Sequence, residues 1–148
     1  MYLQNSVASY IPTNLDYYEE YYSTIAFSGA WSQSITVSFT AIGNTYRMVT
    51  CSFQTSLTAT TISSNTLHNS TAFPARFRPG FATKSFTVWG RDKDLETEIL
   101  VNVSTGGVFT MGPYPTGAST EQTPANFGAG TTNSAAVYAT AFSWLAGS

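Results

Sequence analysis

A chain of 148 residues, 43% of them hydrophobic, is long enough to fold around one core and leaves little room for two domains. Only 9% of the residues are charged, against about 25% in an ordinary soluble domain, whereas 15% are aromatic. The net charge is −2 with no basic run, and no stretch of about 18 apolar residues occurs, which excludes the usual nucleic-acid-binding surface and a membrane-spanning helix.

The chain begins with a segment that shows little patterning, residues 1–16. We expect it to be an N-terminal extension or linker, and residues 17–148 to form one folded domain. The opening MYLQNSVASY lacks the basic and apolar parts of a secretory signal. We therefore expect a protein that is made and assembled in a cytoplasm, or a domain of a longer chain.

Alternation of apolar and polar side chains dominates from residue 17 onward. Ile35, Val37 and Phe39 alternate with hydroxyl side chains, which predicts a strand with one buried and one wet face. Turn residues separate this strand from further expected strands over residues 21–28, 45–53, 57–62, 84–90, 99–103 and 107–111. This spacing predicts an all-β fold, an antiparallel jelly-roll β-sandwich of about eight to ten strands.

Residues 112–135 are rich in Gly, Pro, Thr and Ala and predict a long loop. Long loops on a rigid scaffold often carry function. Tyr114, held between Pro113 and Pro115, is therefore a candidate ligand-binding residue, because a rigid aromatic side chain can stack on a sugar or anchor a protein partner. The alternative is an aromatic side chain that folds back onto the sheets.

The last segment, residues 136–145, is predicted as one closing strand. Tyr138, Phe142 and Trp144 would lie on one of its faces, and the other face is also mostly apolar. A strand that is apolar on both faces is buried on both faces, by a second sheet or by another subunit. We expect these three aromatic residues in the core or in the contact between copies of a homotrimer.

Few residues offer reactive chemistry. His68 is the only histidine and lies in a polar stretch without a nucleophile motif, so we expect it in an exposed loop or strand end. Cys51 is the only cysteine, so it cannot form an intrachain disulfide and is expected as a small buried apolar residue. Glycosylation sequons occur at Asn69 and Asn102, and chance produces such sequons at this Ser and Thr content.

Three acidic residues, Asp94, Glu96 and Glu98, occur at every second position. On a strand they would line one face, a spacing that suits a glycosidase pair or a calcium site. The simpler interpretation is a solvated hairpin end at which Arg91 and Lys93 neutralise part of the charge. We accordingly expect no catalytic residues, no cofactor and no metal.

A family resemblance rests on five stretches: YYEEYYSTIAFSGAW (17–31), SITVSFTAIGNTYRM (34–48), FPARFRPGFATKSFTVW (73–89), VNVSTGGVFTMGP (101–113) and AVYATAFSWL (136–145). Together they resemble the head domains of phage and large-virus fibre or capsid proteins, which are similar to the tumour-necrosis-factor and complement globular-head superfamily. The resemblance covers roughly residues 17–146. It implies a ten-strand jelly roll that forms a tight homotrimer, and it brings no catalytic motif and no receptor-binding residue.

The expected function is that of a non-enzymatic structural protein on the virion surface. A trimeric fibre or spike head would contact other virion proteins and bind a host-surface glycan or protein. One alternative is a minor capsid or decorating protein with a purely structural role. A second is a small carbohydrate-active enzyme on a β-sandwich, and a cellular ligand of the tumour-necrosis-factor type would use the same fold.

Overall fold

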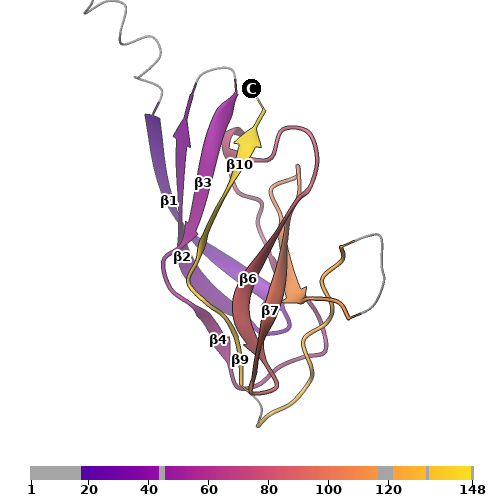
Figure 1. The fold of residues 1–148 in the computed structure, drawn as a ribbon. Coiled ribbons are helices and arrows are strands. Elements are labelled where there is room, and N and C mark those ends of the chain that lie inside the picture. The colour runs from indigo at the N-terminus through magenta and orange to yellow at the C-terminus, as the bar shows by residue number, and fades with distance from the viewer. Residues whose placement is uncertain (1–17, 44–45, 117–121, 133, 148) are drawn as a thin grey trace, which may run out of the picture.

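The computed structural model describes residues 18–43, 46–116, 122–132 and 134–147, so the extension expected over residues 1–16 lies outside the described residues. The described chain contains ten strands and one 3-10 turn, η1 (Figure 1). Their bounds are β1 (Tyr18–Gly29), β2 (Gln33–Ile42), β3 (Arg47–Phe53), β4 (Leu57–Ala59), β5 (Leu67–Asn69), η1 (Ala75–Phe77), β6 (Lys84–Asp92), β7 (Leu95–Val103), β8 (Phe109–Pro113), β9 (Ala135–Val137) and β10 (Ala141–Ala146).

All ten strands belong to one antiparallel sheet with the order β10-β3-β2-β1-β5-β8-β7-β6-β9-β4. The sheet curls, so that the part containing β1, β2, β3 and β10 faces the part containing β6, β7 and β8 (Figure 1). The prediction of an all-β antiparallel fold with eight to ten strands is thereby confirmed. Among the described residues there is no helix with the length and hydropathy needed to cross a membrane.

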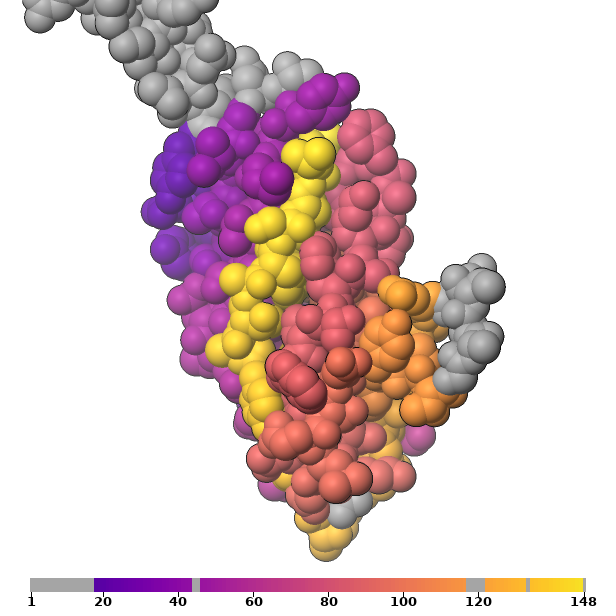
Figure 2. All heavy atoms as spheres, in the orientation of Figure 1, coloured from indigo at the N-terminus to yellow at the C-terminus, as the bar shows by residue number. Residues whose placement is uncertain are grey.

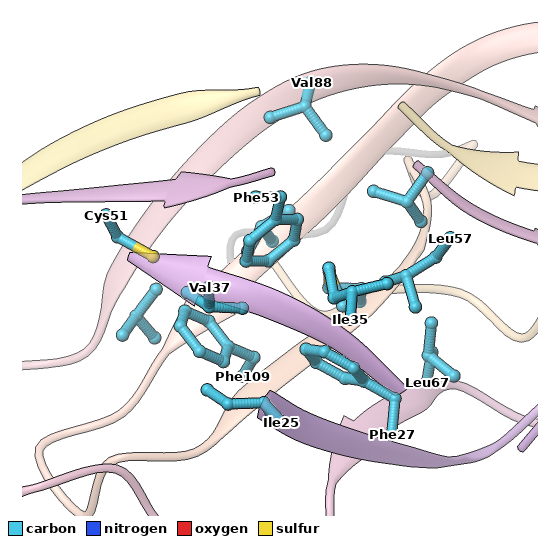
Figure 3. Close-up of a cluster of buried hydrophobic side chains, with 14 of the residues drawn as sticks. Ile25, Phe27, Ile35, Val37, Cys51, Phe53, Leu57, Leu67, Val88 and Phe109 are labelled. Carbon is cyan, nitrogen blue, oxygen red and sulfur yellow. The ribbon is translucent and has the colours of Figure 1, made fainter. Parts of the chain in front are cut away.

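A core rich in aromatic residues fills the space inside the curled sheet. Phe27 of β1, Phe53 of β3 and Phe109 of β8 point toward one another (Figure 3), and the Phe53 and Phe109 ring centroids are 5.6 Å apart. Phe86 of β6 stacks on Phe142 of β10 at 4.8 Å. Because these pairs join opposite parts of the sheet, burial of their rings holds the curl closed.

The closing segment corrects one prediction, because residues 136–145 are not a single strand. β9 pairs with β4 and β6, whereas β10 pairs with β3, and residues 138–140 connect the two. The backbone N–H of Phe53 donates to the carbonyl of Thr140 at 2.9 Å. This hydrogen bond holds the connecting segment against the end of β3, where the chain passes from β9 to β10. The chain breaks its strand there because it leaves one part of the curled sheet and joins the other.

The position of β9 depends on Gly90 of β6. A Cβ atom at Gly90 would lie 2.2 Å from the carbonyl oxygen of Ala136 and 2.5 Å from the side chain of Ile99. Only a residue without a side chain allows β9 to approach β6 this closely. This close approach places the segment after β9 beside the end of the β6–β7 hairpin.

Candidate functional site

The β6–β7 hairpin ends in a tight turn that is tied to the segment before β9. Lys93 and Asp94 form the turn with φ values of +50° and +65°. The Asp94 carboxylate accepts hydrogen bonds from the Ser134 backbone N–H at 2.8 Å and from its hydroxyl at 2.6 Å. These bonds lower the pKa of Asp94. They also hold the segment that precedes β9 against the hairpin turn.

Arg91, Glu96 and Tyr138 meet beside this turn. Both Nη2 and Nε of Arg91 donate to Oε1 of Glu96, at 2.8 and 3.2 Å, and Nη1 donates to the Ser134 hydroxyl at 3.2 Å. The Tyr138 hydroxyl donates to the same Glu96 oxygen. The hydrogen bonds from Tyr138 and Arg91 lower the pKa of Glu96, and the same contacts raise the pKa values of Arg91 and Tyr138. The three side chains are thus fixed in one arrangement at the surface.

Trp89 lies two residues before Arg91 on the same outward face of β6 and is 61% exposed. We define the Tyr138 platform as the outward-facing side chains of this region: Thr58, Trp89, Arg91, Glu96, Ser134 and Tyr138. Three strands, β4, β6 and β9, hold it together with the start of β7.

An open depression of about 420 Å³ lies in this surface, lined by Thr58, Ala59, Thr60, Arg91, Ser134, Ala135, Ala136 and Tyr138. A second depression of about 450 Å³ shares the residues 58–60 and is otherwise lined by Gly29, Ala30, Trp31, Ser32, Gln33, Thr61 and Ser63. The two hollows adjoin along β4. Hydroxyl and amide side chains supply most of their polar lining.

The three predicted acidic residues do not act as one group. Asp94 binds Ser134, Glu96 binds Arg91 and Tyr138, and Glu98 lies opposite Trp89 in the β6–β7 register. No group of three or more His, Cys, Asp or Glu side chains in the described part of the chain could hold a metal ion. The expected neutralisation by Arg91 is present as its ion pair with Glu96.

A second notable surface lies on the outer face of β1, β2, β3 and β10. The register aligns Tyr18 with Ile42, Ile42 with Met48, and Met48 with Leu145. These four side chains are 53%, 56%, 47% and 45% exposed, and they form an apolar row across four neighbouring strands. Figure 2 shows β10, in yellow, lying along the molecular surface between the strands coloured purple and those coloured salmon.

Polar and aromatic residues border the apolar row. The next aligned positions on these strands are Glu20, Thr40, Thr50 and Ser143, and the hydroxyls of the last two are 2.8 Å apart. On the other side, the exposed rings of Tyr46 and Phe81 lie 6.2 Å apart. An apolar centre with a polar border is the usual anatomy of a protein–protein contact.

The predicted aromatic residues of the closing segment have different positions. Phe142 and Trp144 point into the core and are 8% and 4% exposed, and the Trp144 indole N–H donates to the Phe77 carbonyl at 2.7 Å. They are core residues within one chain, and their role between copies stays a prediction. Tyr138 is half-buried and belongs to the platform.

Tyr114 is half-buried beside β7. Its backbone N–H donates to the Glu98 carbonyl at 2.9 Å, and its hydroxyl accepts a hydrogen bond from the Gln122 amide at 3.1 Å. These bonds tie Tyr114 to β7 through its backbone and to Gln122 of the predicted loop through its hydroxyl. Ligand binding by Tyr114 stays a prediction.

The Asn69 side chain is buried at the end of β5 with 4% exposure. Its amide donates to the carbonyls of Thr71 and Gly107 at 2.8 and 3.1 Å, and its oxygen accepts the Phe109 N–H at 2.6 Å. In this position the amide nitrogen is inaccessible to a glycan in the folded chain. The Asn102 amide is half-buried and donates to the Gln122 carbonyl at 2.9 Å.

His68 and Cys51 occupy the kinds of position that the sequence predicts. His68 is exposed on β5, with its Nδ1 atom 3.4 Å from the Ser28 hydroxyl. Cys51 is fully buried in β3, and burial raises the pKa of its thiol well above the ordinary value.

The platform and the apolar row are the two surfaces that distinguish this molecule, and both arise from strand register. No protein-family model matches the chain, and a search of curated proteins finds no similar sequence. The resemblance to viral fibre heads therefore stays a prediction, and functional inference rests on these two surfaces.

Proposed function

We propose that this chain is a non-enzymatic head domain of a trimeric viral fibre or spike, with a jelly-roll arrangement of its curled sheet. The head is exposed on the virion, contacts other virion proteins and binds a glycan or protein on the host surface. The apolar row across β1, β2, β3 and β10 is the observation that carries this proposal, because it offers a surface for self-association.

The size of the exposed apolar surface favours association. A buried aromatic side chain covers about 150–250 Å², so a half-exposed ring presents on the order of 100 Å². The four residues of the apolar row together with Tyr46 and Phe81 then present about 500–600 Å². This area is at the upper limit for the largest apolar patch of a typical monomer and approaches the roughly 800 Å² that each partner contributes to a stable interface.

The low charge of the chain lowers the free energy required for association. With 9% charged residues, few charged side chains must lose water when copies meet. Within the apolar row itself all four side chains are uncharged. A cluster of identical weak sites on such an assembly would then bind a host surface through avidity.

The hydrogen bonds of Asp94 and Glu96 do not favour either carboxyl as the acid of an enzyme. Hydrogen bonds lower the pKa values of Asp94 and Glu96, which keeps both carboxyls ionised. A glycosidase needs one carboxyl with a raised pKa to protonate the leaving group. A purely structural capsid role would use the same apolar row, and the position of the chain in an intact particle distinguishes that role from attachment.

Light scattering on the full chain in solution tests the proposal directly. We expect a mass of three times 16.0 kDa, and a mass of one chain would contradict it. Ile42→Asp places a charge in the apolar row and should shift the mass to one chain while circular dichroism still shows a folded sheet. Ser34→Asp, at an exposed position on the same strand, is the matched control and should leave the trimer intact.

A further inference from the structure

We propose that the Tyr138 platform binds one neutral pyranose ring of a host-surface glycan, an inference that rests on the proposed attachment function. Side chains with hydroxyl or guanidinium groups line an open hollow: Thr58, Arg91, Ser134 and Tyr138. Trp89 and Glu96 lie beside it, since the Tyr138 backbone N–H bonds to the Trp89 carbonyl and the Tyr138 hydroxyl bonds to Glu96. Each of these features matches one property of an uncharged sugar.

The aromatic side chains provide the apolar contact. One face of a pyranose ring consists mainly of C–H groups, which stack on an aromatic ring. Trp89 is 61% exposed, and the hydrogen bond from the Tyr138 hydroxyl to Glu96 holds the Tyr138 ring in a fixed orientation. Because this ring is already ordered, stacking a sugar on it costs little conformational entropy.

The polar groups provide the hydrogen bonds that a sugar requires. A sugar hydroxyl both donates and accepts, so it suits a site in which donors and acceptors lie side by side. Arg91 presents guanidinium N–H groups, Glu96 presents carboxylate oxygens, and Thr58 adds a hydroxyl at the edge of the hollow. The mutual bonds of Arg91, Glu96 and Ser134 fix this arrangement before any ligand arrives.

The charge of the site favours a neutral sugar over an acidic one. Residues 91–98 contain two basic and four acidic side chains, so this hairpin end carries a net negative charge. The charge of the Arg91 guanidinium is already compensated by its ion pair with Glu96, so Arg91 adds little net attraction for a ligand carboxylate. Sialic acid or a uronic acid would therefore meet repulsion from Asp94, Glu96 and Glu98.

The dimensions of the surface fit a sugar better than a protein partner. A hollow of about 420 Å³ lies within the usual range of small-molecule sites. The adjoining hollow of about 450 Å³ beyond β4 could receive the next unit of the glycan, since its lining includes Ser32, Gln33 and Ser63. The apolar row, on the other part of the sheet, is the surface that we assign to a protein contact.

Saturation-transfer NMR with matched sugars tests the inference on the full chain. The probes are the methyl glycosides of glucose, galactose and mannose, each compared with its C6 carboxylate counterpart. We expect saturation of the C–H protons of at least one neutral glycoside and at least tenfold weaker binding of the corresponding acid. Absence of binding by all three neutral glycosides, or preference for the acids, would overturn the inference.

Three variants locate the binding on the platform. Tyr138→Ala and Trp89→Ala should each weaken binding of the neutral glycoside about tenfold or more. Trp89→Ala changes only an exposed side chain, so it remains informative if Tyr138→Ala does not fold. Tyr22→Ala removes an equally exposed ring from β1 and should leave binding unchanged. If Trp89→Ala and Tyr138→Ala both bind as the parent does, the platform is not the site.

Light scattering on the same samples separates this inference from the proposed function. A trimer that binds no neutral sugar refutes only the platform assignment. A single chain that binds the sugar refutes the trimeric head and leaves the platform assignment standing.

Discussion

Asn69 is one of three buried polar or charged residues in the described chain, and its replacement tests the register of β5 and β8. β5 pairs with β8 through Leu67 and His68, and the ladder then stops. At the next position the Asn69 side chain replaces the missing strand pairing by accepting the Phe109 N–H at 2.6 Å. The same amide donates to the carbonyls of Thr71 and Gly107.

We expect Asn69→Ala to lower the free energy of unfolding by about 2–4 kcal/mol, since each hydrogen bond contributes about 1 kcal/mol and the buried Phe109 N–H loses its partner. Asn69→Asp has the same size and retains the acceptor for Phe109. Its second oxygen would face two carbonyl oxygens where the amide donates, so at neutral pH it should destabilise at least as strongly.

The pH dependence of Asn69→Asp provides the decisive measurement. The introduced carboxyl has a raised pKa in the folded chain because its charged form is disfavoured there. The destabilisation should therefore be complete above the folded pKa and fade as the pH falls toward about 3.9, the value expected in the unfolded chain. Urea unfolding followed by tryptophan fluorescence at several pH values measures this change.

Asn102→Asp serves as the control, since Asn102 is half-buried and should lose less than about 1 kcal/mol. A neutral-pH midpoint for Asn69→Asp that equals the parent's would show that the amide does not occupy the buried position between β5 and β8, and the reasoning would fail.

Three further changes test other parts of the structure. Glu19→Gln removes the negative charge that pairs with Arg47 at 2.8 Å and should lower the free energy of unfolding by about 1–3 kcal/mol at pH 7. The hydrogen bond from Arg47 lowers the pKa of Glu19 below 4.5. The stabilisation by this pair is therefore present above pH 4.5 and is lost as the pH falls through the folded pKa of Glu19. An acid titration of the stability of Glu19→Gln should lack this loss. Gly90→Ala should lower the free energy of unfolding by about 1–3 kcal/mol, because the new Cβ would lie 2.2 Å from the Ala136 carbonyl oxygen. An unchanged melting temperature in thermal unfolding would contradict the close approach of β9. Trp144→Ala should lower the free energy of unfolding by about 3–5 kcal/mol, measured in the same way. If the ring packs within one chain, this loss should not depend on the protein concentration.

Strands with strict alternation could be predicted from the sequence because each carries its own pattern. In β2 the apolar residues Ile35, Val37 and Phe39 are all buried, as period-two alternation requires. β5 was not predicted, since three residues within a polar stretch carry no pattern. Its strand pairing depends on β1 and β8, which are distant in the sequence.

The break in the closing segment has no local cause in the sequence. Residues 138–140 include neither Gly nor Pro, and the run around them reads as one apolar strand. The strand ends because β9 and β10 have different partners in the curled sheet. Tertiary pairing therefore overrides the local pattern here.

The candidate surfaces differ in how far the sequence predicts them. The pairing of Arg91 with Glu96 follows from a hairpin with a two-residue turn, and charge neutralisation there was expected. Tyr138 reaches Glu96 from 42 positions away, which only the register of β9 determines. The apolar row likewise combines residues from four strands, and each strand alone shows only one exposed apolar side chain at that level.

The two surfaces lie at opposite ends of the curled sheet, which bears on how assembly and binding could coexist. The apolar row lies where β1 begins and β2 and β10 end, whereas the platform lies at the end formed by β4, β9 and the β6–β7 turn (Figure 1). Copies that meet on the apolar row would therefore leave every platform uncovered at the far end. Variants in one surface should then leave the other function intact, so Ile42→Asp would abolish the trimer while each separate chain retains its sugar affinity.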